Sequence, residues 1–539
     1  MGTSSNLHRR LTGILLGAGM LGISLAGGAL ATPEQAAASA PAPAPSSMSL
    51  SQQIDTLIGE PRFAEADWGI SVISLDTGRT IYAYHADQLL QPASTAKLFT
   101  AAVALSEFGP DYRIPTRVLA TGDIHNGQLS GPLILYGMGD PTLGTDASTQ
   151  SWPDQLAEQL AAQGLRHVHG DLIADATYFA SPTMGTGWEA IDLQSWFAVP
   201  ATALSVGENE VNVTITPAQT AGMPAEVTPD PAEAIPSLVN EITTSQPRTR
   251  NDINLYRAPG DGVLYAFGNI AVRSPAQTYK LAVPDPARYA GNLLREALAR
   301  HGIQMDGKVQ PVQWPRRDPA LMAPPHTLAE VLSPPLGEIV SRGLKRSQNL
   351  YLQNLLLLAG VKAQADAEQH DGEAGFITSE RWGIRAMHQL LEQIGISPSA
   401  SVIEEGTGLS RRNLATPNAM ARLLAFLASQ PYAATVQAAL PVAGVDGTLQ
   451  WRMRNTPAAN NVRAKTGSMS FVHCLAGYVT TGDGERLAFA IMLNNYNPPE
   501  GAPSASRDLD AIAVMLAGLR GHPGGVAAGA PAVATHPAN

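Results

Sequence analysis

Apolar residues recur along this chain with the periods of both strands and helices. The stretches from Ile70 to Leu75 and from Thr80 to Tyr84 each have the pattern of a strand, and the Asp-Thr-Gly turn between them predicts a hairpin. A proline then precedes a run with helical spacing, from Ser94 to Phe108. This spacing predicts that Ser94 lies at a helix N-terminus, with Lys97 one turn further along the same face.

The C-terminal part of the chain repeats this mixture. The segment from Ile339 to Leu358 contains two helical stretches, and a helix is predicted from Ser506 to Leu519. Between them, three strand patterns separated by turns predict a β-meander. The strands are Val462 to Ser468, Leu475 to Thr480 and Leu487 to Leu493. Helices that flank an antiparallel sheet indicate an α+β fold.

The intervening sequence has a different character. About 250 residues between Lys97 and Ser347 contain many short strand patterns separated by turn residues. Examples are Leu133 to Tyr136, Gly170 to Ile173, Val211 to Ile215 and Val263 to Val272. This pattern predicts one or two inserted domains that are mostly β.

Both ends of the chain differ from the rest. Residues 1–31 have the features of an export signal: His8, Arg9 and Arg10, a charge-free apolar stretch, and an Ala-Leu-Ala cleavage site before Thr32. The alternative is an uncleaved anchor that would keep the protein associated with the membrane. In either case we expect an extracytoplasmic protein. Residues 32–47 and 521–539 are rich in Ala and Pro and are expected to be disordered.

Composition narrows the function further. The formal net charge of −11, without a basic stripe, argues against a nucleic-acid partner. The single cysteine, Cys474, excludes an intramolecular disulfide and is expected to be a buried strand residue. The pair His167 and His169 lacks an acidic helix motif, so we interpret it as structural or surface and expect no metal or cofactor.

Three short motifs carry the candidate chemistry, and their order along the chain is informative. They are Ser94-Thr95-Ala96-Lys97, Ser347-Gln348-Asn349 and Lys465-Thr466-Gly467, the last followed by Ser468. Two of the chain's six lysines fall inside them. Together they have the S-x-x-K, S-x-N and K-T-G pattern of serine acyl-transfer enzymes that react with β-lactams.

These residue types suit nucleophilic catalysis. A serine hydroxyl needs a base, and Lys97 can be that base for Ser94 only when its amine is neutral. Burial and a nearby Lys465 would both lower the pKa of Lys97. Ser347 is expected to relay a proton to the leaving amine, and Asn349 to hold the substrate amide. We expect the substrate carboxylate to be bound by Lys465, Thr466, Gly467 and Ser468. The backbone N–H groups of Ser94 and Ser468 are expected to form the oxyanion hole.

With these motifs the chain resembles the class C low-molecular-mass penicillin-binding proteins, the D-alanyl-D-alanine carboxypeptidase/endopeptidases. Three other stretches support the resemblance: residues 137–143 (GMGDPTL), 406–411 (GTGLSR) and 441–449 (PVAGVDGTL). The resemblance implies a β-lactamase/transpeptidase-like domain, residues 48–115 and 316–520, interrupted by two inserted domains, residues 116–200 with 286–315 and residues 201–285. It also implies removal of the terminal D-Ala from peptidoglycan stem peptides, cleavage of D,D cross-links, and acylation by β-lactam antibiotics.

The resemblance also suggests a specificity pocket. By similarity, Asp192 and Arg411 bind the free end of the stem-peptide diamino acid, and Met469 lines the same pocket. The sequence departs from the usual pattern of the family at two places. The middle motif of the family is commonly S-D-N, whereas Gln348 occupies the Asp position here. Glu405-Gly406-Thr407-Gly408 likewise replaces Asp-Gly-Ser-Gly. Since Gln348 is not the reactive side chain, we expect activity to survive.

Two rival functions are open at this level. A class A serine β-lactamase needs a Glu-x-x-(Leu)-Asn element after the middle motif, and the sequence has none between Asn349 and Lys465. The stretch Glu208-Asn209-Glu210-Val211-Asn212 is similar to it, but it precedes Ser347 and has the pattern of a strand start. The other rival is a non-catalytic cell-wall-binding protein with the same fold.

Overall fold

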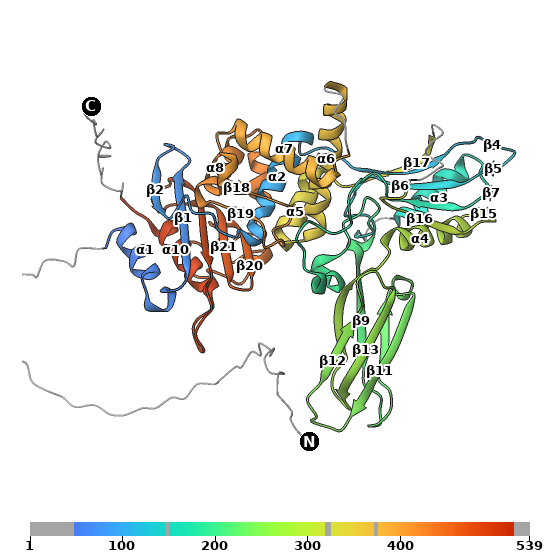
Figure 1. The fold of residues 1–539 in the computed structure, drawn as a ribbon, viewed down its shortest axis with the longest axis horizontal. Helices are drawn as coiled ribbons and strands as arrows, with labels where there is room; N and C mark the ends of the chain where they lie inside the picture. Colours follow the sequence, from blue (N-terminus) through green and yellow to red (C-terminus); the bar gives the residue numbers. More distant parts are fainter. Residues whose placement is uncertain (1–47, 147–149, 318–324, 371–375, 522–539) are drawn as a thin grey trace, which may run out of the picture. The chain divides into compact units, whose positions relative to one another are not determined.

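The computed structural model of the protein describes residues 48–146, 150–317, 325–370 and 376–521 (Figure 1). The predicted export signal (1–31), the predicted linker (32–47) and residues 522–539 of the predicted tail lie outside the described residues. Within the described ranges, no helix is both long enough and apolar enough to cross a membrane.

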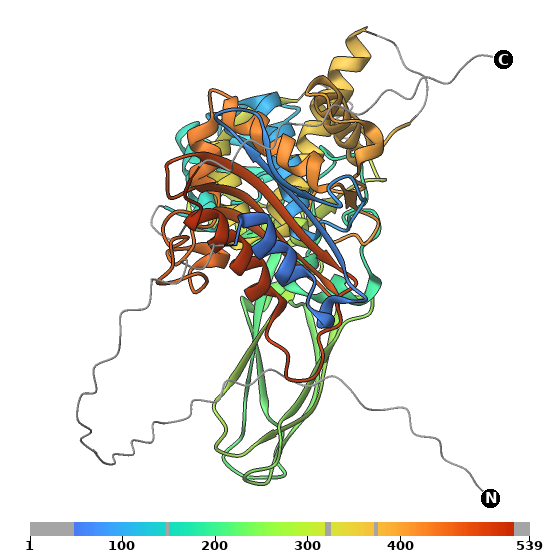
Figure 2. The same cartoon turned by 90° about the vertical axis from the view of Figure 1, so that its left-hand side faces the viewer.

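A five-stranded antiparallel sheet is formed by strands from both ends of the chain. Its strand order is β2-β1-β22-β21-β20, so the N-terminal hairpin pairs with the C-terminal meander. Figure 2 shows α1 and α10 together over one face of this sheet, where Ile54, Leu509 and Ile512 share a core with the strands. The predicted antiparallel sheet with flanking helices is confirmed. The bounds are α1 (Leu50–Ile58), β1 (Asp67–Ser74), β2 (Thr80–Tyr84), β20 (Arg463–Met469), β21 (Val472–Thr480), β22 (Arg486–Asn494) and α10 (Ala505–Gly518).

Further helices lie against the other face of the sheet. Helix α8 contacts β1 and β22, and α2 contacts α5, α6, α7 and α8. Every residue of α2 from Lys97 to Leu105 is buried, so a lysine at its start lies in a dry environment. The bounds are α2 (Lys97–Phe108), α5 (Leu336–Arg346), α6 (Asn349–His370), α7 (Ser379–Gln393), α8 (Pro417–Ser429), α9 (Ala433–Ala439) and the hairpin β18 (Ser401–Val402) with β19 (Leu414–Ala415).

The segment predicted as the first inserted domain, called here the first inserted unit, contains two sheets, with strand orders β16-β8-β6-β3-β17 and β15-β7-β5-β4. Two helices, α3 and α4, pack together and cover it, because Leu156, Leu160, Leu294 and Leu298 repeat with helical spacing and are fully buried. Strand β17 pairs with β3, so this sheet includes residues beyond the predicted boundary at 316. The bounds are β3 (Pro115–Ala120), β4 (Ile124–His125), β5 (Gln128–Ser130), β6 (Leu133–Gly137), α3 (Trp152–Ala162), β7 (His167–His169), β8 (Leu172–Asp175), α4 (Pro286–Arg300), β15 (Gln304–Met305), β16 (Val309–Val312) and β17 (His326–Leu332).

The segment predicted as the second inserted domain, called here the second inserted unit, forms a pair of three-stranded sheets, β10-β9-β14 and β11-β13-β12. Alternate residues of their strands, including Val211, Val213, Leu264 and Ala266, meet in a separate core. This is the architecture of a small β-sandwich. The bounds are β9 (Glu210–Thr216), β10 (Glu226–Asp230), β11 (Ser237–Ser245), β12 (Asp252–Tyr256), β13 (Val263–Ala271) and β14 (Gln277–Ala282).

Candidate active site

Ser94 and Lys97 lie on one turn of helix. A short 3-10 helix, Ala93–Ala96, leads directly into α2, whose first residue is Lys97. The Nζ atom of Lys97 is 3.0 Å from the Oγ atom of Ser94. Lys97 is fully buried, whereas Ser94 is only partly buried. The predicted S-x-x-K geometry therefore exists, with a buried amine beside a more accessible hydroxyl.

Close backbone contacts hold this turn in position. Ala93 has a left-handed φ of 46°, which is unusual for a residue with a side chain. A Cβ atom on Gly408 would lie 1.9 Å from the Ala93 carbonyl oxygen, and one on Gly467 would lie 2.8 Å from that of Pro92. Only glycine lets both segments approach so closely, and these contacts fix the backbone on which Ser94 sits.

The Ser347-Gln348-Asn349 motif connects two helices. Ser347 ends α5 in a left-handed conformation with a φ of 59°, and Asn349 begins α6. The Asn349 Oδ1 atom accepts a hydrogen bond from Lys97 at 2.5 Å, while its Nδ2 atom donates to the carbonyl of Phe197 at 2.6 Å. The motif thus reaches Lys97 directly, and its amide orientation is set by both partners.

The Lys465-Thr466-Gly467 motif lies on β20, the edge strand of the five-stranded sheet. Lys465 is fully buried and its Nζ atom donates to Ser347 Oγ at 2.9 Å and to its neighbour's carbonyl, Thr466 O, at 2.7 Å. Ser468, by contrast, is exposed. The structure therefore brings all three motifs together, in the pairs Ser94–Lys97 and Ser347–Lys465, with Asn349 bonded to Lys97.

Burial changes the protonation of both lysines. Burial lowers the pKa of Lys97 from 10.5 to about 7, although the charge of Glu405 opposes the change. Burial also lowers the pKa of Lys465 well below its usual value, and the charge of Lys97 lowers it further. At neutral pH a substantial fraction of the molecules therefore has a neutral amine at Lys97.

The bonding partners of Lys97 suit that neutral form. Besides Ser94, its amine contacts Asn349 Oδ1 and the carbonyl oxygen of Thr407, the latter at 2.7 Å. Both are acceptors only, so they take the two N–H bonds of a neutral amine. In the neutral amine the remaining lone pair is then free to accept a proton from the hydroxyl of Ser94, which lies 3.0 Å away. This arrangement can remove a proton from Ser94.

Two acidic groups that support the site were not predicted. Glu405 is fully buried and accepts hydrogen bonds from several groups of its own loop and from the indole of Trp188. Its loop presents the Thr407 carbonyl to Lys97. The stretch Glu405-Gly406-Thr407-Gly408 stood out in the sequence by resemblance only, because nothing in its pattern revealed this contact.

The other unpredicted group is Glu208, at the start of the second inserted unit. Its carboxylate accepts hydrogen bonds from the two terminal guanidinium nitrogens of Arg346, at 2.7 and 2.8 Å, and from Tyr351 and Gln348, at 2.8 and 3.2 Å. Gln348 also donates to Glu210 at 2.6 Å. Arg346 and Gln348 are the neighbours of Ser347, so these carboxylates hold the chain on both sides of that serine.

The predicted specificity residues lie near one another, and Arg411 pairs with a neighbouring glutamate. Asp192 lies in a 3-10 turn, and burial and the charge of Glu189 raise its pKa, against the effect of Arg411. The guanidinium of Arg411 pairs with Glu189 at 3.1 Å and also contacts the Ser470 carbonyl. Met469, at the end of β20, packs against Leu90, Ala93, Val472, Cys474 and Met492. Cys474 is itself buried on a strand, as predicted.

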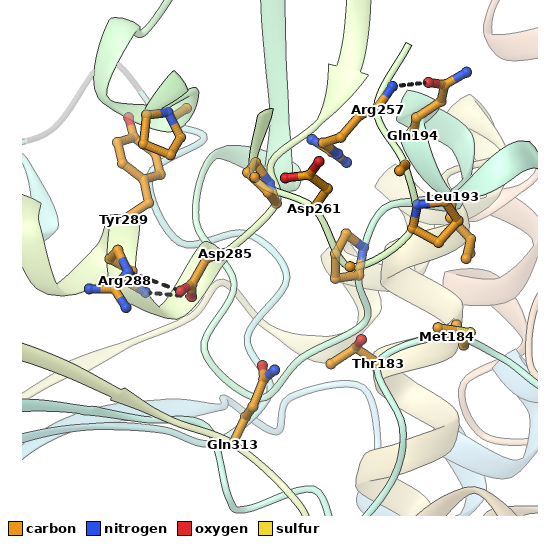
Figure 3. Close-up of a pocket in the computed structure, with 18 of the residues that line it drawn as sticks. Thr183, Met184, Leu193, Gln194, Arg257, Asp261, Asp285, Arg288, Tyr289 and Gln313 are labelled. Atoms are coloured by element: carbon orange, nitrogen blue, oxygen red, sulfur yellow. Dashed lines mark hydrogen bonds and ion pairs between the residues drawn. The ribbon is translucent and has the colours of Figure 1, made fainter. Parts of the chain in front are cut away.

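A cavity of about 520 Å³ lies next to the segment that follows Asp192. Leu193 and Gln194 line it together with residues of the second inserted unit and of α4. Figure 3 shows its walls, with the backbone N–H of Arg257 bonded to Gln194 and with Arg288 paired to Asp285. None of the residues that line it belongs to the predicted site, so this cavity is separate from the Ser94 cluster.

Comparison with known proteins agrees with this geometry. A family model described as the D-Ala-D-Ala carboxypeptidase 3 (S13) family matches residues 50–517. The chain is 35% identical over 489 residues to a D-alanyl-D-alanine carboxypeptidase of Actinomadura sp., covering 88% of this chain and 85% of that protein. It is 28% identical over 438 residues to the D-alanyl-D-alanine carboxypeptidase DacB of Haemophilus influenzae, covering 80% of this chain and 85% of that protein.

A solved structure supports the same assignment. Penicillin-binding protein 4 from Haemophilus influenzae has a TM-score of 0.72 and 26% identity, and the match covers 86% of this chain and 97% of that chain. The same protein complexed with a β-lactam has a TM-score of 0.67. These findings confirm the resemblance to penicillin-binding carboxypeptidases and the predicted fold class. The chain belongs to the D-Ala-D-Ala carboxypeptidase 3 (S13) family of peptidases.

Proposed function

We propose that this peptidase removes the terminal D-Ala of peptidoglycan stem peptides through an acyl-enzyme on Ser94. The observation that carries the proposal is the fully buried Lys97 amine, 3.0 Å from Ser94 Oγ and with acceptors for both of its N–H bonds. Neutral Lys97 takes the proton of Ser94 as the oxygen attacks the carbonyl of the penultimate D-Ala. The backbone N–H groups of Ser94 and Ser468 stabilise the developing oxyanion.

The second half of the reaction uses the other motifs. Ser347, hydrogen-bonded to Lys465, relays the proton that Lys97 took from Ser94 to the departing D-Ala amine, so that Lys97 is neutral again, and Asn349 holds the substrate amide. Lys465, Thr466, Gly467 and Ser468 form the site for the terminal carboxylate. A carboxylate there raises the pKa of Lys465, so substrate binding is accompanied by proton uptake. Water then attacks the acyl-enzyme and restores Ser94.

The partners follow from this chemistry. A β-lactam carries a strained amide and a carboxylate in the same relation as D-Ala-D-Ala, so it acylates Ser94 and blocks the site. The solved relative complexed with a β-lactam supports this part of the proposal. We further propose that the enzyme acts outside the cytoplasm after export by residues 1–31, and that it also cuts D,D cross-links.

Labelling with a fluorescent penicillin tests the proposal. We expect an adduct that lasts for minutes or longer, and trypsin should release it on the peptide from Thr80 to Lys97, which contains Ser94. The unlabelled protein should release D-alanine from a peptide ending in D-Ala-D-Ala. Rapid loss of the label with repeated penicillin hydrolysis would indicate a β-lactamase, while no adduct and no D-alanine release would leave only a binding protein.

The pKa of Lys97 predicts the pH dependence of acylation. Only the neutral amine can accept the Ser94 proton, and burial lowers its pKa to about 7. The second-order rate constant for penicillin acylation should therefore rise with pH below 7 and level off above it. Stopped-flow measurements from pH 5 to 9 would check this, and a rate that is flat or falls across the range would contradict it.

The same shift predicts how stability changes with pH. Between about pH 7 and pH 10.5 the unfolded chain holds a proton on Lys97 that the folded chain has lost. Stability rises with pH wherever the unfolded state binds more protons, so this residue contributes increasing stability across that window. Urea unfolding of Lys97→Met beside the wild type should show a smaller slope with pH for the variant.

Asp192 should affect peptide substrates but not penicillins. If its carboxylate binds the ammonium group at the free end of the stem peptide, Asp192→Asn should raise KM for such a peptide by about tenfold, or about 1.4 kcal/mol. A β-lactam lacks that end, so its acylation rate should stay within about twofold. The exposed Asp111, changed to Asn, is the matched control. An equal loss with an N-acetylated peptide would contradict the assignment.

A further inference from the structure

Three polar side chains converge at the surface of the first inserted unit. His167 and His169 lie two residues apart on β7, so both side chains point to the same face while Val168, between them, is buried in the core. Strand β15 runs parallel to β7, with Gln304 opposite His167 and Met305 opposite Val168. Asp306 is the next residue, and its backbone N–H donates to the Val168 carbonyl. The pairing of the strands thus brings Asp306 beside both histidines.

The contacts between the three side chains are short. The Asp306 carboxylate lies 2.6 Å from His167 Nε2 with one oxygen and 2.8 Å from His169 Nδ1 with the other. The two imidazole rings are stacked, with their centroids 4.1 Å apart. One nitrogen of each histidine and one carboxylate oxygen all lie within 4.8 Å of one another. The donor atoms therefore lie close enough together for small side-chain rotations to bring them around one metal ion.

We propose that His167, His169 and Asp306 form a binding site for a divalent transition-metal ion, with Zn²⁺ as the reference ion. Two imidazole nitrogens and one carboxylate oxygen are ligands that this ion takes at about 2.0–2.2 Å. In a tetrahedral arrangement such ligand atoms are about 3.3 Å apart, so an Asp306 contact of 2.6 or 2.8 Å lengthens by about 0.5–0.7 Å when the ion binds.

The three side chains of the site are partly exposed to solvent, which determines how an ion would be coordinated there. The side chains of His167, His169 and Asp306 are 28%, 39% and 57% exposed. Water can therefore complete the coordination, and the ion exchanges with solvent. The site also joins two distant parts of the sequence, because Asp306 is 137 residues from His169. A bound ion fastens β15 to β7 and stabilises the folded state by mass action.

Metal titration of the full-length, untagged chain tests this proposal. After treatment with a chelator and desalting, calorimetry with Zn²⁺ at pH 7.5 should show one saturable site for each chain. Adding Zn²⁺ should also raise the thermal midpoint, and Co²⁺ should give the visible absorption bands of a nitrogen- and oxygen-ligated ion. A wild-type chain without saturable binding of either ion would overturn the proposal.

Single substitutions locate the site. His167→Gln, His169→Gln and Asp306→Asn should each weaken Zn²⁺ binding at least tenfold, whereas His125→Gln, an exposed histidine on β4 of the same sheet, should not. Thermal midpoints without metal and penicillin labelling of each variant show whether it is folded. Because the substitutions are independent, loss of one variant to misfolding leaves the others informative. Wild-type affinity in folded His169→Gln would overturn the assignment.

Discussion

Replacing Lys97 by methionine should slow penicillin acylation by about 10²- to 10⁴-fold, the range that a positioned general base contributes. Methionine keeps most of the length of the side chain but cannot accept the Ser94 proton. The Asn349 and Thr407 oxygens lose their donor, so a fall in stability of about 1–3 kcal/mol is also expected. The second-order acylation rate constant, measured with a fluorescent penicillin, checks the first effect, and urea unfolding checks the second.

Two other variants show what the Lys97 result means. Ser94→Ala should take no label at all, because it removes the nucleophile, whereas Lys97→Met should still label slowly. Lys362→Met is the matched control, since Lys362 is a partly exposed lysine on α6 that pairs with Glu107 and Asp366. Its acylation rate should be that of the wild type. An acylation rate in Lys97→Met within tenfold of wild type would assign the base to another group.

Local sequence patterns predicted the parts of the site that depend on local geometry. Ser94 and Lys97 share a helical turn, and a strand at Lys465 follows from the apolar pattern of the meander. The order of the three motifs along the chain indicated the Ser347 motif, because spacing alone gives no reason for Ser347 to face Lys465. The sequence therefore predicted which residues form the cluster, while only the structure showed the hydrogen bonds between them.

The supporting groups could not be predicted for a physical reason. Glu208 precedes Gln348 by 140 residues, and where it contacts the motif both Glu208 and Asn209 adopt left-handed backbone conformations. No propensity favours that conformation for glutamate, so the pattern suggested an ordinary strand start. Similarly, the pairing of β17 with β3 joins segments that are distant in the sequence, and no local pattern specifies it. Because of this pairing, the sheet of the first inserted unit extends past the predicted boundary at residue 316.

Glu208 gives the second large prediction, because it connects an inserted unit to the Ser347 motif. Glu208 is only 8% exposed, and burial alone would raise the pKa of its carboxyl group. The hydrogen bonds and charge of Arg346, with those of Tyr351 and Gln348, reverse that effect and leave the pKa lowered. The carboxylate is thus kept ionised by the residues on both sides of Ser347, and those residues are held in place in return.

Glu208→Gln should therefore lower both stability and the rate of acylation. The amide lacks the charge for Arg346, and its NH₂ group cannot accept from Tyr351 or Gln348. Because Arg346 is half exposed, we expect a loss of about 2 kcal/mol rather than the full cost of a buried ion pair. A shift of Ser347 by about 1 Å would slow acylation by about 10²-fold. Glu330→Gln, which breaks a partly exposed pair with Arg117, is the matched control.

Gln348→Asp separates this positioning role from general stability. It introduces the residue common in the family's middle motif, yet here a third carboxylate would meet Glu208 and Glu210, and both hydrogen bonds from the Gln348 amide would be lost. Acylation should fall at least tenfold, and Glu210→Gln in the same chain should restore most of it by supplying a donor. If Gln348→Asp acylates like the wild type, the two carboxylates do not position Ser347. If the double variant only regains stability without regaining the acylation rate, their role is in folding alone.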